Sequence, residues 1–273
     1  MHTDFATITG TRHAATAEFN QDYATARDTA AGRAWAIVAD GCGGSGGRTD
    51  LGAREWVLAA DQLLADKSLL DAPGAEIQLD LLTRADARLQ HLPPEDALAT
   101  LALLEATPTR LRALFFGDGA LLLRHGDGTV TFVNVQFDTN APQYLAYHRQ
   151  LRHLDQWQRE YGHGHRRVVT NRLGAEGELL GIRVHEESAL APLWAHAFDL
   201  AREDIDLAIV TTDGIGSFEE PVKLFELARE LTAVRSPTGA FLRRRLGRLG
   251  REWRTAGTLP ADDLTVAGIW LRP

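Results

Sequence analysis

Hydrophobic and polar residues follow two different periods along this chain, and the changes of period divide it into segments. Residues 34–39 form a continuous apolar run that ends at Asp40 and a glycine-rich stretch, which is typical of a buried strand leading into a loop. Residues 3–9 and 12–26 are mixed and compatible with strands. A turn at 28–32 predicts a hairpin between the second of these segments and the apolar run. The strand is therefore expected to deliver Asp40 to the rim of a sheet.

Helical spacing follows the glycines. Apolar residues recur every three or four positions across 51–70 and again across 77–92, so each segment is predicted to form an amphipathic helix. Pro93 and Pro94 end the second helix, because proline has no backbone N–H to donate.

Residues 97–135 return to short apolar runs. Four runs lie at 97–104, 110–116, 120–124 and 129–135. Turn residues separate them, and two of the turns contain Asp-Gly, a strong hairpin signal: Thr107-Pro108, Gly117-Asp118-Gly119 and Gly126-Asp127-Gly128. We expect an antiparallel meander.

The remainder of the chain begins with a segment that has no clean period. Residues 138–170 are polar, aromatic and rich in His and Arg, and we interpret them as an excursion or lid. A strand at 207–211, helices at 219–234 and 238–254, and a last strand at 264–271 are predicted after it. No Ser/Gly linker divides the sequence, so residues 1–273 are expected to form one domain of the α+β class, a layered sandwich.

Composition and charge exclude several kinds of partner. The chain has 273 residues, of which 44% are hydrophobic and 24% charged, as in an ordinary globular protein. Its formal net charge of −8 argues against general affinity for nucleic acid or anionic membranes. Cys42 is the only cysteine, so no internal disulfide forms, and no signal segment or long apolar span is seen. We expect a cytoplasmic monomer.

Acidic residues recur where predicted strands end or begin. Asp40 and Asp213 each follow an apolar strand and precede glycine, and Asp262-Asp263 precede the last strand. If these strands are neighbours, carboxylates meet at one sheet edge, where their repulsion requires cations or captured protons. Oxygen ligands select Mg²⁺ or Mn²⁺. Two such ions held ~3.5–4 Å apart are a recurring arrangement for phosphate-ester hydrolysis.

Six motifs in order span nearly the whole chain. They are Asn20-Gln21-Asp22, Val38-Ala39-Asp40-Gly41-Cys42-Gly43-Gly44, Gly117-Asp118-Gly119, Arg172-Leu173-Gly174, Thr212-Asp213-Gly214 and Asp262-Asp263-Leu264-Thr265-Val266. This series resembles the metal-dependent Ser/Thr protein phosphatases of the protein phosphatase 2C type. The resemblance implies a four-layer αββα sandwich, with two central antiparallel β-sheets flanked by helices and a binuclear Mn²⁺/Mg²⁺ centre at one end.

The resemblance also implies roles for individual residues. Asp40 would bridge both metals, the Gly41 carbonyl would bind one, and Asp213 and Asp262 would hold the other. Asp22 would support the site, and Asp118 matches the carboxylate of a third, weaker metal. The nucleophile would be a metal-bound water, held by Asp40 and Asp213, that attacks phosphorus without a phosphoenzyme. The implied substrate is a phosphoprotein, the target of a Ser/Thr kinase.

A non-enzymatic member of the same fold is the main alternative. Gln21 stands where the family commonly has Glu, and Ala17 stands where an arginine that grips phosphate is expected. Arg12 or Arg48 are the candidates to replace that arginine. Without such a group the protein would act as a regulatory module that binds phosphoproteins or other partners.

Three further patterns have competing interpretations. Gly41-x-Gly43-x-x-Gly46 fits a dinucleotide fingerprint, although Asp40 would repel the pyrophosphate. Cys42 and Arg48 have the Cys-x5-Arg spacing of cysteine-dependent phosphatases, although Asp40 would raise the thiol pKa. The arginines of helix 238–254 indicate either a solvated face or a docking face for an acidic partner.

Overall fold

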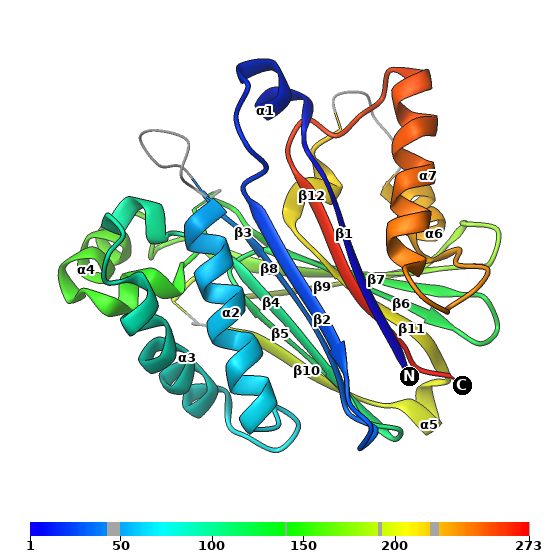
Figure 1. Cartoon of the computed structure of the whole chain (residues 1–273), viewed down its shortest axis with the longest axis horizontal. Helices are drawn as coiled ribbons and strands as arrows, with labels where there is room; N and C mark the ends of the chain where they lie inside the picture. Colours follow the sequence, from blue (N-terminus) through cyan, green and yellow to red (C-terminus); the bar gives the residue numbers. More distant parts are fainter. Residues whose placement is uncertain (43–49, 140, 191–192, 219–223, 273) are drawn as a thin grey trace.

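Two antiparallel sheets face each other at the centre of the computed structural model (Figure 1), which describes residues 1–42, 50–139, 141–190, 193–218 and 224–272. The larger sheet has seven strands, in the spatial order β1 (His2–Ile8), β12 (Leu264–Trp270), β11 (Ile205–Thr211), β6 (Gly119–His125), β7 (Val130–Phe137), β8 (His165–Leu173) and β9 (Leu179–Ser188). The smaller has five, in the order β10 (Trp194–Asp199), β5 (Arg110–Phe116), β4 (Leu101–Ala106), β3 (Ala34–Asp40) and β2 (Asp22–Asp28).

Helices α2 and α3 cover the outer face of the smaller sheet, and α6 and α7 that of the larger sheet; the chain also has shorter or peripheral helices. Their bounds are α1 (Thr11–Thr16), α2 (Asp50–Asp66), α3 (Gly74–Leu89), α4 (Leu151–Glu160), α5 (Leu200–Glu203), α6 (Leu224–Thr232) and α7 (Phe241–Ala256), with short 3-10 helices η1 (Pro94–Ala97), η2 (Leu145–Arg149) and η3 (Asp213–Gly216). In Figure 1, α2 and α3 lie on one side of the strands and α6 and α7 on the other. The four-layer αββα sandwich predicted from the sequence is confirmed.

The strand at the centre of the prediction, β3, is buried on both faces. Trp35 and Ile37 pack with α2 and α3 in the outer core of the smaller sheet, whereas Ala36 and Val38 pack in the core between the two sheets. Because both faces of β3 meet apolar neighbours, its sequence is a continuous apolar run and does not alternate with polar residues. A third core joins the larger sheet to α6 and α7.

The predicted hairpin from β2 to β3 is present, and it places two acids side by side. The two strands pair antiparallel with Asp22 opposite Asp40. Part of the segment predicted as strand before β2 is helical instead: Thr11–Thr16 forms α1, which ends at Ala17 in a left-handed conformation. The backbone N–H groups of Thr11 and Arg12 bond to the segment that precedes β12, at Pro260 and Ala261, so α1 is tied to that segment and not to a strand ladder.

The meander predicted for residues 97–135 is wrong at its midpoint. β4 pairs with β5, and β6 pairs with β7, as expected, but β5 and β6 belong to different sheets. The Gly117-Asp118-Gly119 turn is therefore a crossover. Gly119 has a φ of +136°, and a Cβ there would lie 2.7 Å from the Thr211 carbonyl oxygen of β11, with which β6 pairs. Glycine thus permits both the turn and the close approach of β6 to β11.

The segment interpreted as an excursion contains two kinds of structure. η2 and α4 occupy its first part, and from His165 onward the chain is β8 of the larger sheet. Trp157 of α4 packs with Phe137 and Ala189 in a small separate cluster. The lid function itself stays a prediction.

Four of the arginines on α7 interact within the chain. Arg243 lies over the Phe5 ring, Arg244 and Arg245 donate to backbone carbonyls, and Arg248 pairs with Glu252 at 2.8 Å. These contacts favour the solvated face over the docking face for an acidic partner. No helix in the described part of the chain is both long and apolar enough to cross a membrane.

Candidate functional site

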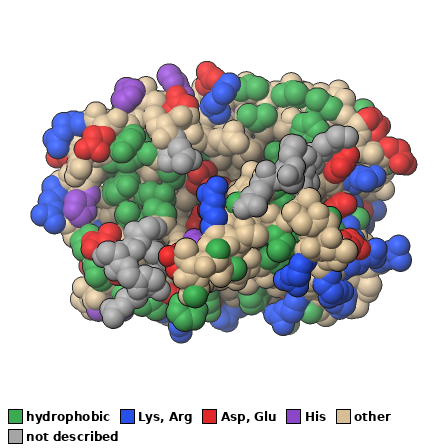
Figure 2. All heavy atoms as spheres, turned by 90° about the horizontal axis from the view of Figure 1, so that it is seen from above, with side chains coloured by type: hydrophobic (Ala, Val, Ile, Leu, Met, Phe, Trp, Pro, Cys, Tyr) green, Lys and Arg blue, Asp and Glu red, His purple; other side chains and the backbone are tan. Residues whose placement is uncertain are grey.

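A cavity of about 250 Å³ opens at the end of the sandwich where β3 terminates. It is lined by His13, Gln21, Asp40, Gly41, Cys42, Thr100, Asp118, Pro142, Tyr144, Asp213 and Asp262. Figure 2 views the molecule from this end, and acidic side chains are visible near the middle of the face. The structure thus brings the acids predicted from separate motifs to one place.

Asp40 lines the cavity from the end of β3, and Asp22 lies buried beside it on the paired strand β2. Asp40 is the last residue of β3, and Asp22 is the first of β2, directly opposite it. Asp22 is buried, and its Oδ2 accepts a hydrogen bond of 2.8 Å from the Thr212 hydroxyl. Its Oδ1 is also buried and has no partner among the described residues. One carboxylate oxygen is therefore fixed by Thr212, and the other is buried without a hydrogen bond from the described residues.

Asp213 and Asp262 come from neighbouring strands of the larger sheet. Asp213 begins η3 directly after β11, and Asp262 lies two residues before β12. Only glycine fits after Asp213, because a Cβ on Gly214 would lie 1.8 Å from the Asp263 carbonyl oxygen. The Thr212 hydroxyl accepts a 3.0 Å bond from the Thr265 N–H and so fixes the two strand ends to each other.

Asp118 enters from the crossover between the sheets. Its neighbour Gly117 has a φ of +98°, and a Cβ on Gly117 would lie 2.8 Å from the Thr100 Cγ2 atom. Residues other than glycine rarely adopt this conformation, so Gly117 lets the chain turn and direct Asp118 to the cavity. The error in the meander prediction therefore falls at a residue of the site.

The carboxylates hold protons unusually tightly in the absence of a cation. Burial raises the pKa of Asp40 well above its ordinary value, and the charges of Asp22 and Asp213 raise it further. Burial also raises the pKa values of Asp22 and Asp213. For Asp118, burial and then the charge of Asp213 raise the pKa to about 7. The cavity offers the carboxylate oxygens of Asp40, Asp118, Asp213 and Asp262, and an oxygen donor set whose repulsion a cation would relieve fits hard divalent ions.

The metal-free protein is expected to lose stability as pH rises. A carboxyl group whose pKa is raised on folding stabilises the folded state below its unfolded pKa, and this contribution disappears as pH rises through the folded pKa. For Asp118 the window runs from about 4 to about 7. We expect the free energy of unfolding in EDTA to be about 1–3 kcal/mol lower at pH 8 than at pH 5. Urea denaturation at the two pH values measures it.

Asp118→Asn is the control for this pH dependence, since asparagine does not titrate. The difference in the free energy of unfolding between the variant and the unmodified protein should grow from pH 5 to pH 8, in favour of the variant. A difference that does not change with pH would contradict the assignment to Asp118.

Two residues near the cavity were missed by the sequence analysis. Asp263 is 2% exposed and accepts backbone hydrogen bonds from Gly10, at 2.8 Å, and Gln21, at 2.6 Å. His13 of α1 lies with its Nδ1 2.9 Å from Asp263 Oδ2 and 3.8 Å from Asp262 Oδ1. Asp263 was noted only as part of an acidic pair, and His13 lay in a segment predicted as strand. Neither position carried a local signal.

The candidates for gripping phosphate are not brought together. Arg12 is exposed on α1 and does not line the cavity. Arg48 lies outside the described residues, as do Gly43 and Gly46 of the dinucleotide fingerprint. All strand pairings of the described residues are antiparallel, whereas that fingerprint requires a parallel βαβ unit.

The environment of Cys42 does not favour a thiolate. Burial raises the pKa of the Cys42 thiol, a hydrogen bond with Tyr144 lowers it in part, and the charges of Asp118 and Asp213 raise it again. A nucleophilic cysteine needs a lowered pKa.

The same fold is found in solved structures of bacterial phosphatases. Stp1, a serine/threonine phosphatase from Staphylococcus aureus, matches with a TM-score of 0.57 and 14% identity, over 100% of this chain and 96% of that one. A bacterial serine phosphatase gives a TM-score of 0.56 and 14% identity, over 100% and 98%. PppA, described as a regulatory component of T6SS in Pseudomonas aeruginosa, gives 0.55 and 18%, over 98% and 97%. Identities this low establish the fold alone.

The chain therefore has the α+β sandwich fold of these structures. The chain belongs to the protein phosphatase 2C family, whose sequence profile matches residues 9–249. Sequence comparison with curated proteins gives no match.

Proposed function

We propose that this protein is a metal-dependent phosphatase that hydrolyses phosphoserine and phosphothreonine in proteins. The observation that carries the proposal is the convergence of Asp40, Asp118, Asp213 and Asp262 on one cavity. These acids come from both sheets and from the crossover between them. The pKa values of Asp40, Asp118 and Asp213 are raised by burial and by neighbouring carboxylates, a repulsion that a bound cation would relieve. Membership of the family supports the reaction class.

The residues divide into metal ligands and groups that face substrate. Asp40, the Gly41 carbonyl, Asp213 and Asp262 would hold two Mn²⁺ or Mg²⁺ ions, with Asp118 available to a third and Asp22 supporting Asp40. Bound ions of this kind polarise phosphoryl oxygens and lower the pKa of water. Thr212 fixes the Asp22 carboxylate through its hydroxyl and ties β11 to β12.

His13 and Gln21 are positioned to face the phosphate. Both line the cavity, and His13 is the residue of the described lining that can carry a positive charge. Asp263 holds both in place, through the Gln21 N–H and the His13 ring. His13 is thus suited to bind a phosphoryl oxygen or to give a proton to the leaving group.

Metal removal tests the proposal directly. We expect hydrolysis of p-nitrophenyl phosphate and of a phosphothreonine peptide with Mn²⁺ or Mg²⁺, and at least about 100-fold less in EDTA, because metal ions supply most of the charge stabilisation for such reactions. Restoring Mn²⁺ should restore turnover. No turnover with either metal would contradict the proposal.

One observation favours a second candidate, a phosphoprotein-binding module without catalysis. The described lining of the cavity contains no Arg or Lys. Gln21, in place of the common Glu, is also a neutral partner for water. This candidate predicts that the phosphothreonine peptide binds, measured by calorimetry, more tightly than its unphosphorylated form and is not turned over in Mn²⁺.

Replacing Cys42 with serine separates the metal reaction from a thiol reaction. We expect the Cys42→Ser variant to keep Mn²⁺-dependent turnover to within about three-fold, because the buried thiol with a raised pKa is a poor nucleophile. Steady-state kinetics with p-nitrophenyl phosphate measure the effect. A complete loss of turnover in this variant would indicate that the Cys42 thiol is the nucleophile.

A further inference from the structure

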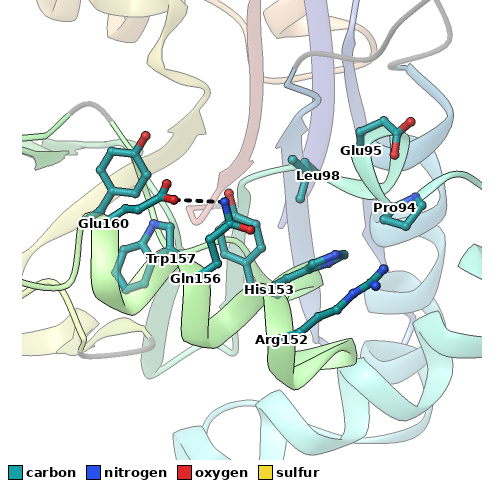
Figure 3. A pocket seen from close by; sticks show the side chains of 10 residues that line it. Pro94, Glu95, Leu98, Arg152, His153, Gln156, Trp157 and Glu160 are labelled. Carbon is teal, nitrogen blue, oxygen red and sulfur yellow. Dashed lines mark hydrogen bonds between the residues drawn. The ribbon is translucent and has the colours of Figure 1, made fainter.

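A groove larger than the acidic cavity lies between α4 and η1 (Figure 3). Its volume is about 470 Å³. Apolar and aromatic side chains contribute from both sides, namely Pro94, Leu98, Tyr147, Trp157 and Tyr161. Figure 3 shows Arg152 and His153 extending from α4 toward the side of the groove formed by Pro94.

The walls of the groove and of the acidic cavity are in contact. Cys42 and Tyr144 line the cavity, whereas Leu98 and Tyr147 line the groove. Cys42 N–H donates a 3.1 Å bond to the Leu98 carbonyl, and the Tyr144 and Tyr147 rings are in edge contact, with centroids 5.5 Å apart. A peptide whose phosphate enters the cavity can therefore reach the groove with a neighbouring side chain.

The aromatic wall of the groove is held in place before any ligand arrives. Trp157 is 2% exposed, and its indole N–H donates to the Ala141 carbonyl at 3.2 Å. Its ring lies 6.4 Å from that of Tyr147, at a tilt of 30°. A preformed wall saves the ordering entropy that binding would otherwise require.

The charged residues at the rim are of mixed sign. Arg152, His153, Glu95 and Glu160 all line the groove, and Gln156 donates to Glu160 at 3.0 Å. A rim of this kind does not select a strongly acidic or basic segment. An apolar interior with a mixed polar rim is typical of a pocket for a hydrophobic side chain.

We propose that this groove is a specificity subsite, which receives a bulky apolar side chain of the phosphoprotein substrate; this inference rests on the proposed function. The Tyr144 and Tyr147 ring centroids lie 5.5 Å apart, and the Tyr147 and Trp157 ring centroids lie 6.4 Å apart. Extended peptide advances about 3.3 Å per residue, so each of these separations corresponds to about two residues, and positions three and four from the phosphorylated residue are the ones to test.

The test compares phosphothreonine peptides that differ at one position. An alanine-rich phosphothreonine peptide receives leucine, phenylalanine or tryptophan at three or four positions before or after phosphothreonine, and kcat/KM is measured with Mn²⁺. We expect one of these placements to raise kcat/KM by about ten-fold or more over alanine, as burial of a large apolar side chain permits.

Two variants of α4 form a matched pair for this test. Gln156 lines the groove and Gln158 does not, and both are exposed. Gln156→Trp fills the groove and should reduce the preference for the apolar peptide to within about two-fold. Gln158→Trp should keep the preference, and both variants should hydrolyse p-nitrophenyl phosphate at the unmodified rate.

The outcomes separate the inference from the function on which it rests. Turnover of p-nitrophenyl phosphate without any peptide preference, or a preference that survives Gln156→Trp, would overturn the subsite and leave the phosphatase intact. No turnover of any substrate would overturn the proposed function. Dissociation constants of the same peptides, from fluorescence anisotropy, then decide whether the groove selects apolar side chains in a binding module.

Discussion

Replacing Asp40 with asparagine is expected to reduce Mn²⁺-dependent phosphatase turnover by at least about 100-fold. Removing a residue that merely supports a metal ligand costs about 10- to 100-fold, and removing a ligand itself should cost at least as much. The same change should raise the free energy of unfolding in EDTA. Asp40 carries a raised pKa because it is buried beside the charges of Asp22, Asp213 and Asp118. Removing its charge would relieve this repulsion but would also remove the proposed bridging metal ligand.

Lower turnover together with higher stability in EDTA distinguishes a functional acid from a structural one. Turnover of p-nitrophenyl phosphate, calorimetry with Mn²⁺ and urea denaturation in EDTA measure them together. Asp155→Asn is the control, because Asp155 is exposed on α4 and does not line the cavity. An Asp40→Asn variant that is less stable in EDTA, or that keeps its turnover, would contradict the assignment.

Replacing Asp263 with alanine is expected to lower the free energy of unfolding by about 3 kcal/mol, even without metal. The buried carboxylate accepts the N–H groups of Gly10 and Gln21, and His13 Nδ1 lies 2.9 Å from it. Alanine would leave two backbone donors without their acceptor. Urea denaturation in EDTA measures the loss.

Asp262 gives the comparison for Asp263, since it is the adjacent acid but its side chain is 44% exposed. Asp262→Ala should change the free energy of unfolding in EDTA by less than about 1 kcal/mol, as is usual for exposed positions. Asp263→Asn keeps one acceptor oxygen and should fall between the two alanine variants. Equal losses for Asp262→Ala and Asp263→Ala would show that Asp263 does not hold the N-terminal segment.

Much of the acidic cavity was predictable because its residues follow strands with a clear signature. β3 and β11 are buried on both faces. β3 ends at Asp40, just before Gly41, and Asp213-Gly214 follows β11 after one residue, so the sequence marks each strand and its end. Because β11 pairs with β12 and β2 pairs with β3, the acids near the ends of these strands lie close together. The separate strand patterns do not specify how the strands are arranged in sheets. The order of the six motifs, through the family resemblance, supplied that arrangement.

The parts that sequence reasoning missed are set by contacts between distant segments. The crossover at Gly117-Asp118-Gly119 has the local pattern of a hairpin, and only the pairing of β6 with β11 reveals the change of sheet. β9 lacks a usable period because its residues are almost all exposed, with Ile182 and Val184 each 54% exposed. His13 becomes part of the cavity only through Asp263, 250 positions away along the sequence.

The pairing of β1 with β12 has a consequence for synthesis on the ribosome. β12 lies between β1 and β11, and β1 has no other partner strand among the described residues. Because residues near both ends of the sequence must meet, β1 waits until β12 has been translated, and contacts of this range form slowly. A nascent or truncated chain that ends before β12 lacks Asp262 and Asp263, so the acidic cavity is assembled only in chains that have been translated past this strand.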